Sequence, residues 1–329
     1  MLMIKPMLFS LLLVACNSND ATTALTGQGT ETEDNDTTLL SRTMDIPAEY
    51  TQRAALKGSI VQIDYATKNY VDGNGEARTN TAYVYLPHEY DESSHKCYNI
   101  LYYVHGHGDT AASLFENEDG AMLNLLDQMI SKGEIAPTIV VSTSYVYGTP
   151  VDYYPDADPY CRALPQELVN DLIPAVESRF HTYAQTADSA GLKATRSHRA
   201  IGGFSMGAVA TWYAFEQALG YFGFFMPISS DSWALGPFAG NDHPEETAAH
   251  LADIARSAAS SENDFRIWAC SGTEDVAYGR IWTQVQAMAK LTDAFPLSRL
   301  TFHEQEGARH DFNALPEYFY NALPVMFPR

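Results

Sequence analysis

A serine flanked by glycines lies where it could act as a nucleophile. Residues 203–207 read Gly-Phe-Ser-Met-Gly, directly after a β-rich run and directly before a helical pattern that begins at Met206. A G-x-S-x-G sequence between a strand and a helix is typical of a nucleophile elbow, in which a sharp turn exposes the serine hydroxyl and the glycines leave space for the crossing backbone. This context makes Ser205 the candidate nucleophile.

A nucleophilic serine needs a base that removes its proton. His310 lies in residues 307–312 (Gly-Ala-Arg-His-Asp-Phe), between the last predicted strand and the last predicted helix. The competing residue is His303, which falls within the strand itself, where a packed or solvent-facing side chain is the simpler interpretation. His310 is therefore the candidate general base.

The base must in turn be held in the right tautomer by a carboxylate. Asp275 lies in the loop at residues 271–275, after a predicted strand at residues 265–270. The resulting chain order of serine, acid and histidine is the one that α/β-hydrolases use. Glu274, one residue earlier, and Asp231, at the end of the preceding strand, remain alternatives for the acid.

Acyl transfer also needs backbone donors for the oxyanion. Residues 105–108 read His-Gly-His-Gly and follow a predicted strand, so the amides of His107 and Met206 are the candidate oxyanion hole. His105, His107 and Asp109 could instead suggest a metal site, but no further cluster supplies the remaining ligands at convincing spacing. We therefore predict neither a metal nor a cofactor.

The elements that would position these residues alternate along the chain. Continuous apolar runs predict strands covered on both faces, and helical patterns lie between most of them. Such alternation predicts an α/β fold with a mostly parallel central sheet, helices on both faces and an antiparallel edge formed by the first strands. The predicted strands are residues 59–65, 81–86, 98–104, 138–145, 200–204, 223–229, 265–270 and 299–303, and the predicted helices are residues 120–131, 165–180, 206–219, 244–258, 278–291 and 316–326.

Composition narrows the function classes. The 329 residues include 46% hydrophobic residues, enough for a sizeable core, and carry a formal charge of −21. Nucleic-acid binding needs clustered cations, so this acidity argues against a nucleic-acid partner. Neutral or weakly charged esters are the easier substrates for such a surface.

The start of the chain predicts export. Lys5 precedes an apolar run at residues 7–15 that is too short to span a bilayer, and residues 13–16 (Leu-Val-Ala-Cys) resemble the lipobox of bacterial lipoproteins. We predict a signal peptide at residues 1–15, a flexible acidic tether at residues 16–45 from a lipidated Cys16, and a catalytic domain at residues 46–329. An ordinary secretory peptide remains the alternative. The expected location is the bacterial cell envelope, with membrane contact only through the anchor, or the exterior.

Three cysteines remain in the predicted mature body. An oxidising compartment permits one disulfide among Cys97, Cys161 and Cys270, but the sequence does not choose the pair. A segment dense in tyrosine also follows the predicted strand at residues 138–145. As a group its rings favour an aromatic or carbohydrate ligand, with Tyr145 and Tyr154 as candidate substrate contacts, although each ring taken singly is better explained by packing.

The four ordered motifs at residues 104–108, 203–207, 272–275 and 307–312 together resemble the carbohydrate esterase family 1 group, also described as esterase D-like. The resemblance covers residues 59–327 and comes nearest to bacterial feruloyl esterases. It implies an α/β-hydrolase fold and a triad of Ser205, Asp275 and His310. It also implies that Trp233, in residues 226–233, lines an aromatic acyl pocket. Ser230 departs from the glycine often found there and leaves the contour of that pocket open.

The implied function is hydrolysis of hydroxycinnamoyl esters, most of all feruloyl esters of arabinoxylan, through an acyl-enzyme. The expected partner is therefore hydroxycinnamoylated or acetylated xylan or its oligosaccharides. An acetyl xylan esterase, an acyltransferase and a siderophore-type esterase are alternatives on the same fold. Outside enzymes, a glycan-binding surface lipoprotein is the alternative. The sequence does not indicate the oligomeric state.

Overall fold

A computed structural model describes residues 38–116, 120–146, 151–258 and 264–329 of the chain. The predicted signal peptide and Cys16 lie outside these residues, so export, lipidation and membrane anchoring stay predictions. Among the described residues, no helix is both long enough and apolar enough to cross a membrane.

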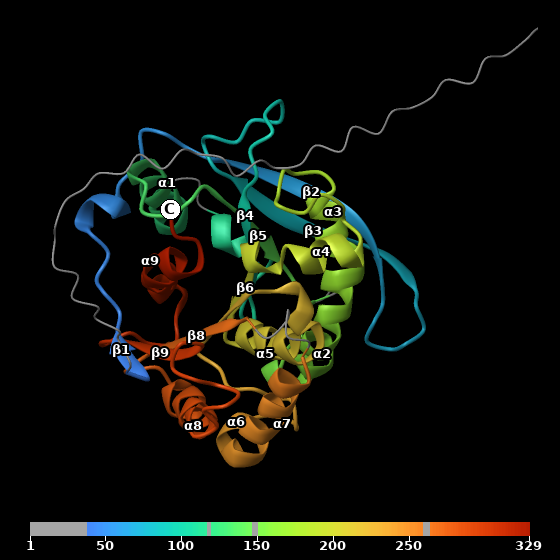
Figure 1. Cartoon of the computed structure of the whole chain (residues 1–329), viewed down its shortest axis with the longest axis vertical. Coiled ribbons are helices and arrows are strands. Elements are labelled where there is room, and N and C mark those ends of the chain that lie inside the picture. The colour runs from blue at the N-terminus through green and yellow to red at the C-terminus, as the bar shows by residue number, and fades with distance from the viewer. Residues whose placement is uncertain (1–37, 117–119, 147–150, 259–263) are drawn as a thin grey trace, which may run out of the picture.

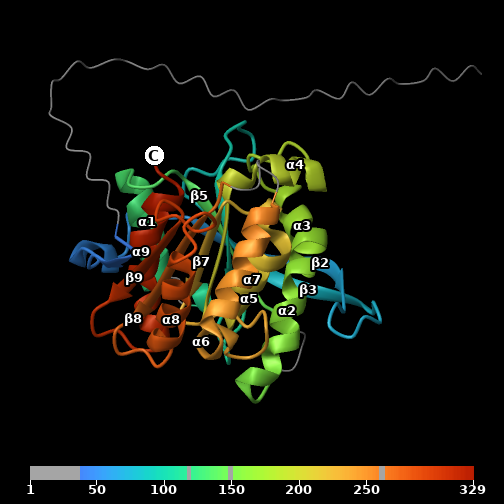
Figure 2. The ribbon, with the colours of Figure 1, turned by 60° about the horizontal axis from the view of Figure 1, so that its bottom comes forward.

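A nine-stranded sheet runs through the centre of the described body, with helices on both sides (Figures 1 and 2). The strand order is β1-β9-β8-β7-β6-β4-β5-β3-β2. The strands are β1 (Leu40–Arg42), β2 (Ser59–Lys68), β3 (Ala77–Leu86), β4 (Asn99–Val104), β5 (Thr138–Thr143), β6 (Arg199–Phe204), β7 (Phe224–Ile228), β8 (Arg266–Gly272) and β9 (Leu300–Gln305). The prediction of a mostly parallel α/β sheet is confirmed.

The antiparallel edge is also confirmed. Strand β2 pairs antiparallel with β3, and β3 pairs antiparallel with β5, whereas β4 to β9 pair in parallel. No helix intervenes between β2 and β3, so the chain can return through a short turn, as an antiparallel pair permits. Each connection between successive strands from β4 to β9 places a helix on one face of the sheet.

Alternating side chains of the central strands feed two apolar layers. Along β4, Ile100 and Tyr102 pack into the layer under α2, α5, α7 and α8, while Leu101 and Tyr103 pack into the layer under α1 and α9. The bounds of the helices are α1 (Ala121–Lys132), α2 (Asp158–Glu167), α3 (Ile173–Glu177), α4 (Ser189–Ala194), α5 (Met206–Ala218), α6 (Ala239–Asp242), α7 (Pro244–Ser257), α8 (Tyr278–Ala289) and α9 (Leu315–Met326). Burial on both faces explains why the strands read as continuous apolar runs.

Helix α2 begins earlier than predicted. We expected Pro165 in a first turn, but α2 starts at Asp158 and Pro165 lies inside it, before a π-helical turn at Leu168–Leu172 and α3. Tertiary contacts explain the extension, because Cys161 is buried against α5 and the Asp158 carboxylate accepts a hydrogen bond from Tyr213 at 2.6 Å. This packing outweighs the cost of a proline within the helix.

The last residues of the predicted tether are not a free linker. Leu40–Arg42 form β1, which pairs in parallel with β9 at the edge of the sheet. Ser41 contacts the ring of His303 at 2.5 Å, and Arg42 pairs with Glu304 at 3.4 Å. The prediction of a flexible tether through residue 45 is therefore wrong at its end, because without β1 the outer side of β9 would expose unpaired backbone groups.

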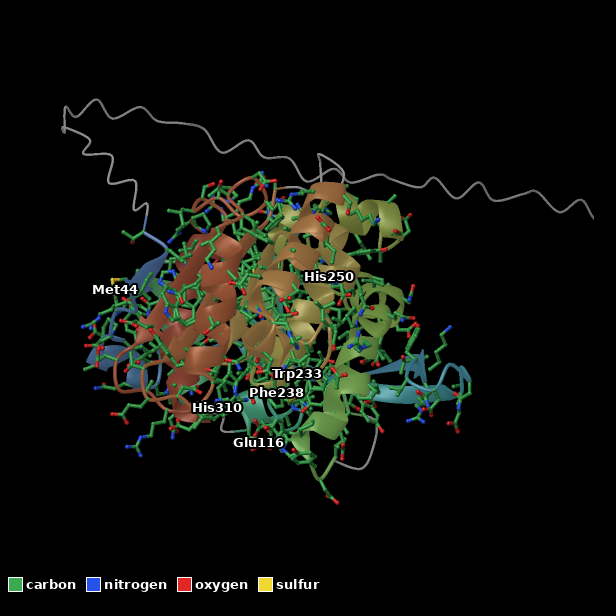
Figure 3. All side chains as sticks on the ribbon, turned by 90° about the horizontal axis from the view of Figure 1, so that it is seen from below. Met44, Glu116, Trp233, Phe238, His250 and His310 are labelled. Carbon is green, nitrogen blue, oxygen red and sulfur yellow. The ribbon has the colours of Figure 1, made fainter. Side chains whose placement is uncertain are left out.

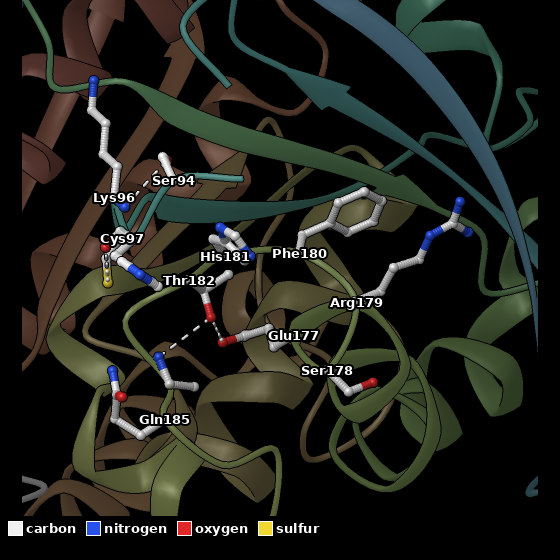
Figure 4. A pocket seen from close by; sticks show the side chains of 12 residues that line it. Ser94, Lys96, Cys97, Glu177, Ser178, Arg179, Phe180, His181, Thr182 and Gln185 are labelled. Carbon is white, nitrogen blue, oxygen red and sulfur yellow. Dashed lines mark hydrogen bonds between the residues drawn. The ribbon is translucent and has the colours of Figure 1, made fainter. Parts of the chain in front are cut away.

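A buried ion pair supports the start of β6, the strand that leads to Ser205. The guanidinium of Arg199 contacts both carboxylate oxygens of Glu177, at 2.6 and 2.8 Å, and the two side chains are 1% and 0% exposed. Thr182 donates to the same carboxylate at 2.9 Å (Figure 4). The pair therefore joins the end of α3 to the central sheet.

Replacing Glu177 by glutamine should strongly destabilise the fold, because it leaves the Arg199 charge buried without a counterion. We expect a loss of about 3–5 kcal/mol in the free energy of unfolding, measured by urea denaturation. Asp293→Asn is the matched control, since it removes the partner of Arg256 in an exposed ion pair and should change stability little. Equal effects of the two substitutions would contradict the structural role of the buried pair.

Candidate active site

Ser205 lies on a strained turn between β6 and α5. Its backbone has φ 55° and ψ −115°, a conformation that side-chain-bearing residues rarely adopt, and its amide donates to the Ile228 carbonyl at 2.9 Å. Gly207 lies so close to β4 that an added Cβ would be 2.0 Å from the Val104 carbonyl oxygen. Only glycine at this position lets α5 cross the sheet closely enough to form the turn.

His310 reaches Ser205 from the loop after β9. Its Nε2 lies 2.9 Å from Ser205 Oγ, and its ring packs against Phe204 with the ring centres 4.7 Å apart. The competing His303 lies in β9, the strand next to the edge strand β1, and stacks on Trp268. The structure thus brings His310 to the serine and gives His303 a packing position.

Asp275 completes a hydrogen-bonded chain of three side chains. Its Oδ1 lies 2.8 Å from His310 Nδ1 and also accepts the amide of Ala277 at 2.7 Å, and its side chain is 0% exposed. Glu274 instead pairs with Arg309 on the surface, and Asp231 accepts the amide of Asn241. Burial raises the pKa of Asp231 to about 6. Of the three carboxylates considered, Asp275 is the one that contacts the histidine.

The loops that carry Asp275 and His310 are tied together. The Glu274 amide donates to the Ala308 carbonyl at 3.0 Å, and the Gly307 amide donates to Thr273 Oγ1 at 2.8 Å. Gly272 permits this contact, because a Cβ there would be 2.1 Å from the Ala308 carbonyl oxygen. Two loops that are distant in the sequence therefore hold the acid and the base at a fixed separation.

The two residues that carry the predicted oxyanion amides lie at the serine pocket. His107 and Met206 both line the pocket that contains Ser205 and His310. Met206 is the first residue of α5, where a backbone N–H has no acceptor within the helix. The His107 ring contacts the Val151 carbonyl at 2.6 Å, which holds the loop after β4 in place.

The neighbouring His105 has a structural environment. It is buried, it contacts Ser144 at 2.8 Å, and burial lowers its pKa to about 4, so it is neutral at pH 7. Among the described residues, no group of three or more histidine, cysteine, aspartate or glutamate side chains is arranged to hold a metal ion.

The pocket beside Ser205 has a volume of about 280 Å³ and an aromatic wall. The rings of Tyr154 and Trp233 lie 6.5 Å apart, and Phe238 packs 4.8 Å from Trp233. Figure 3 shows Trp233 and Phe238 side by side, at the same end of the molecule as His310. The predicted contacts Tyr154 and Trp233 thus lie in one pocket with the serine.

Tyr145 does not line this pocket. It is 1% exposed, and its ring packs at a tilt against His105 with the ring centres 4.9 Å apart. It lines the neighbouring pocket that shares His107, so its contact with substrate stays a prediction. Its position just after β5 directs most of the ring into the core. This agrees with the alternative interpretation that a single tyrosine in this segment packs the loop.

Other residues of the pocket escaped the sequence analysis. Arg280, near the start of α8, and Val276 line it, and the guanidinium of Arg280 lies 4.7 Å from the centre of the Phe238 ring. Phe238 has a positive φ of 62°, a conformation that no sequence pattern revealed. Of these residues, only Val276 could have been linked to the site from the sequence, because it directly follows Asp275.

Among the cysteines of the described residues, no disulfide links any two. Cys161 and Cys270 are both buried free thiols, so no two of Cys97, Cys161 and Cys270 are joined. Burial raises the pKa of both thiols well above its usual value. They pack as small hydrophobic side chains in the two apolar layers.

A doubly covered α/β sheet with a strained serine, an imidazole and a buried carboxylate in hydrogen-bonded order defines the protein as a serine carboxylic ester hydrolase of the α/β-hydrolase fold. Comparison with known proteins agrees. Residues 76–329 match the model of the protein family described as "Putative esterase". The chain therefore belongs to this esterase family.

Individual relatives support the assignment. The chain is 34% identical over 288 residues to endo-1,4-beta-xylanase Y of Acetivibrio thermocellus. This matched region makes up 85% of the present chain but only 24% of the xylanase, so the chain spans about a quarter of that relative's length. A mutant of the feruloyl esterase module from Clostridium thermocellum, solved with sinapinate, is 32% identical with a TM-score of 0.73, over 88% of this chain and 95% of the module. A CE1 ferulic acid esterase from Anaeromyces mucronatus, solved with ferulic acid, shares the fold at 20% identity with a TM-score of 0.62, over 86% of this chain and 96% of that one.

Proposed function

We propose that this protein hydrolyses hydroxycinnamoyl esters of xylan, with feruloyl groups on arabinoxylan as the main substrate. The observation that carries the proposal is the hydrogen-bonded series of Ser205, His310 and Asp275 opening into a pocket walled by Tyr154 and Trp233. A flat phenolic acyl group suits such a wall, because aromatic rings bury large apolar areas against one another. The similarity to a feruloyl esterase module and to a xylanase supports the same substrate class.

The proposed reaction is a two-step acyl transfer. His310 Nε2 takes the proton of Ser205 as Oγ attacks the ester carbonyl, and Asp275 stabilises the imidazolium that forms. The amides of His107 and Met206 hold the oxyanion. His310 then returns the proton to the departing sugar oxygen, and a water molecule hydrolyses the acyl-enzyme by the same steps in reverse.

Steady-state kinetics on methyl ferulate, methyl caffeate and acetylated xylan, run side by side, test the substrate assignment. We expect kcat/KM for the two hydroxycinnamates to exceed that for acetyl release, because an acetyl group leaves the aromatic wall unused. A clear preference for acetylated xylan would instead assign the protein as an acetyl xylan esterase. Transfer of the acyl group to an added alcohol in preference to water would indicate an acyltransferase.

Truncating the aromatic wall should reduce discrimination between acyl groups. For Tyr154→Ala we expect the ratio of kcat/KM for methyl ferulate to that for 4-nitrophenyl acetate to fall about tenfold, the size of one aromatic contact. Tyr153→Ala is the matched control, because Tyr153 is 59% exposed and lies outside the pocket lining. An unchanged ratio in Tyr154→Ala would place the acyl group elsewhere.

A further inference from the structure

A second pocket adjoins the serine pocket, and His107 belongs to the lining of both. This second pocket, of about 290 Å³, lies between the β2–β3 hairpin and the loop after β4. The contact between His107 Nε2 and the Val151 carbonyl fixes the imidazole as part of the shared wall. One side chain therefore lies between the candidate acyl site and an additional binding volume.

The lining of the second pocket differs in chemistry from the aromatic wall. Gln62 of β2 and Tyr83 of β3 are directly opposite in the antiparallel register, so their side chains share one face of the hairpin. Asp109 and Thr110 line the pocket from the loop after β4. An amide, a phenol ring, a carboxyl group and a hydroxyl thus face one volume. Among the described residues of this lining, none is lysine or arginine.

This combination suits the hydroxyl groups of a neutral sugar. The planar amide of Gln62 can both donate and accept, the carboxylate of Asp109 accepts, and the Tyr83 ring offers an apolar face to the C–H groups of a sugar ring. A carboxylate without a neighbouring cation in the lining disfavours anionic sugars such as uronates. By contrast, the serine pocket presents aromatic rings and Arg280.

An ester consists of an acyl group and an alcohol, and each of the two pockets could hold one of them. If the phenolic acyl group occupies the pocket of Tyr154 and Trp233, the carbohydrate must extend beyond the serine in another direction. We propose that the pocket formed by Gln62, Tyr83, Asp109 and Thr110 is a glycan subsite that binds neutral sugar units on the alcohol side of the ester. The inference rests on the proposed function and specifies which part of the polymer the enzyme holds.

The test compares two esters that share the feruloyl group but differ in the alcohol, methyl ferulate and a feruloylated arabinoxylo-oligosaccharide. For Tyr83→Ala we expect the ratio of kcat/KM for the oligosaccharide to that for methyl ferulate to fall about fivefold through the KM of the oligosaccharide. Gln62→Leu removes the amide from an exposed position at similar size and should lower the ratio about threefold. Tyr70→Ala, a tyrosine truncation after β2 but outside this lining, should leave the ratio unchanged.

Direct binding separates failure of the subsite from failure of the proposed function. The Ser205→Ala protein should bind an unesterified arabinoxylo-oligosaccharide in isothermal titration calorimetry, and Gln62→Leu in the same background should weaken that binding about threefold. If Tyr83→Ala does not fold, Gln62→Leu decides the matter in both experiments. Active cleavage of methyl ferulate with unaltered ratios and no oligosaccharide binding would overturn the glycan subsite alone. Absence of cleavage of both feruloyl esters would overturn the proposed function and the subsite with it.

Discussion

Ser205→Ala should lower turnover of methyl ferulate or a 4-nitrophenyl ester by ~10³-fold or more without unfolding the protein. The hydroxyl of Ser205 lies 2.9 Å from His310 Nε2 on a turn that backbone contacts hold, so its removal deletes the attacking atom and leaves the turn in place. Initial-rate kinetics measure the loss. Circular dichroism and thermal unfolding show whether the fold persists.

Ser230→Ala is the matched control for this substitution. Ser230 lines the same pocket, and its backbone carbonyl, which accepts the Trp212 indole at 3.0 Å, is unaffected by the change. We expect turnover within a fewfold of the unmodified protein. Near-normal hydrolysis by Ser205→Ala would remove residue 205 as the nucleophile. Failure of the unmodified protein to react with a fluorophosphonate probe would favour a glycan-binding role over an enzyme.

Asp275→Asn should reduce kcat by about 10⁴-fold, because an amide in place of the carboxylate favours the wrong tautomer of the histidine. The carboxylate accepts a hydrogen bond from the Nδ1–H group of His310, so the ring proton stays on Nδ1 and Nε2 is free to accept the serine proton. Asparagine can instead donate to Nδ1, so the ring proton moves to Nε2. Shape and burial of the side chain hardly change, so the loss reports on charge and tautomer.

Glu274→Gln is the matched control for Asp275→Asn. Glu274 lies next to Asp275 in the same loop, but its carboxylate pairs with Arg309 at 2.9 Å on the surface. Its neutralisation should leave kcat near normal. A loss in Glu274→Gln as large as that in Asp275→Asn would show that the loop, and not the contact to His310, controls turnover.

The sequence alone determined the architecture and the candidate reactive groups. Strands buried on both faces produce continuous apolar runs, so the alternation of strand and helix is visible without coordinates. The motif around Ser205 carries its own signal, because a sharp strand-to-helix turn requires small neighbours such as Gly207. Local backbone geometry and burial restrict which residue types can stand next to one another in the chain. Both can therefore be predicted from the sequence.

Only the tertiary structure decided which side chains meet. Asp275 and Glu274 are adjacent in the chain, and only the path of the loop against Ala308 turns one toward His310 and the other toward solvent. Tyr145 and Tyr154 belong to the same tyrosine-rich segment, yet one is buried on His105 and the other lines the pocket. Contacts between segments far apart in sequence arise from packing of the whole chain. No short pattern of residues records them.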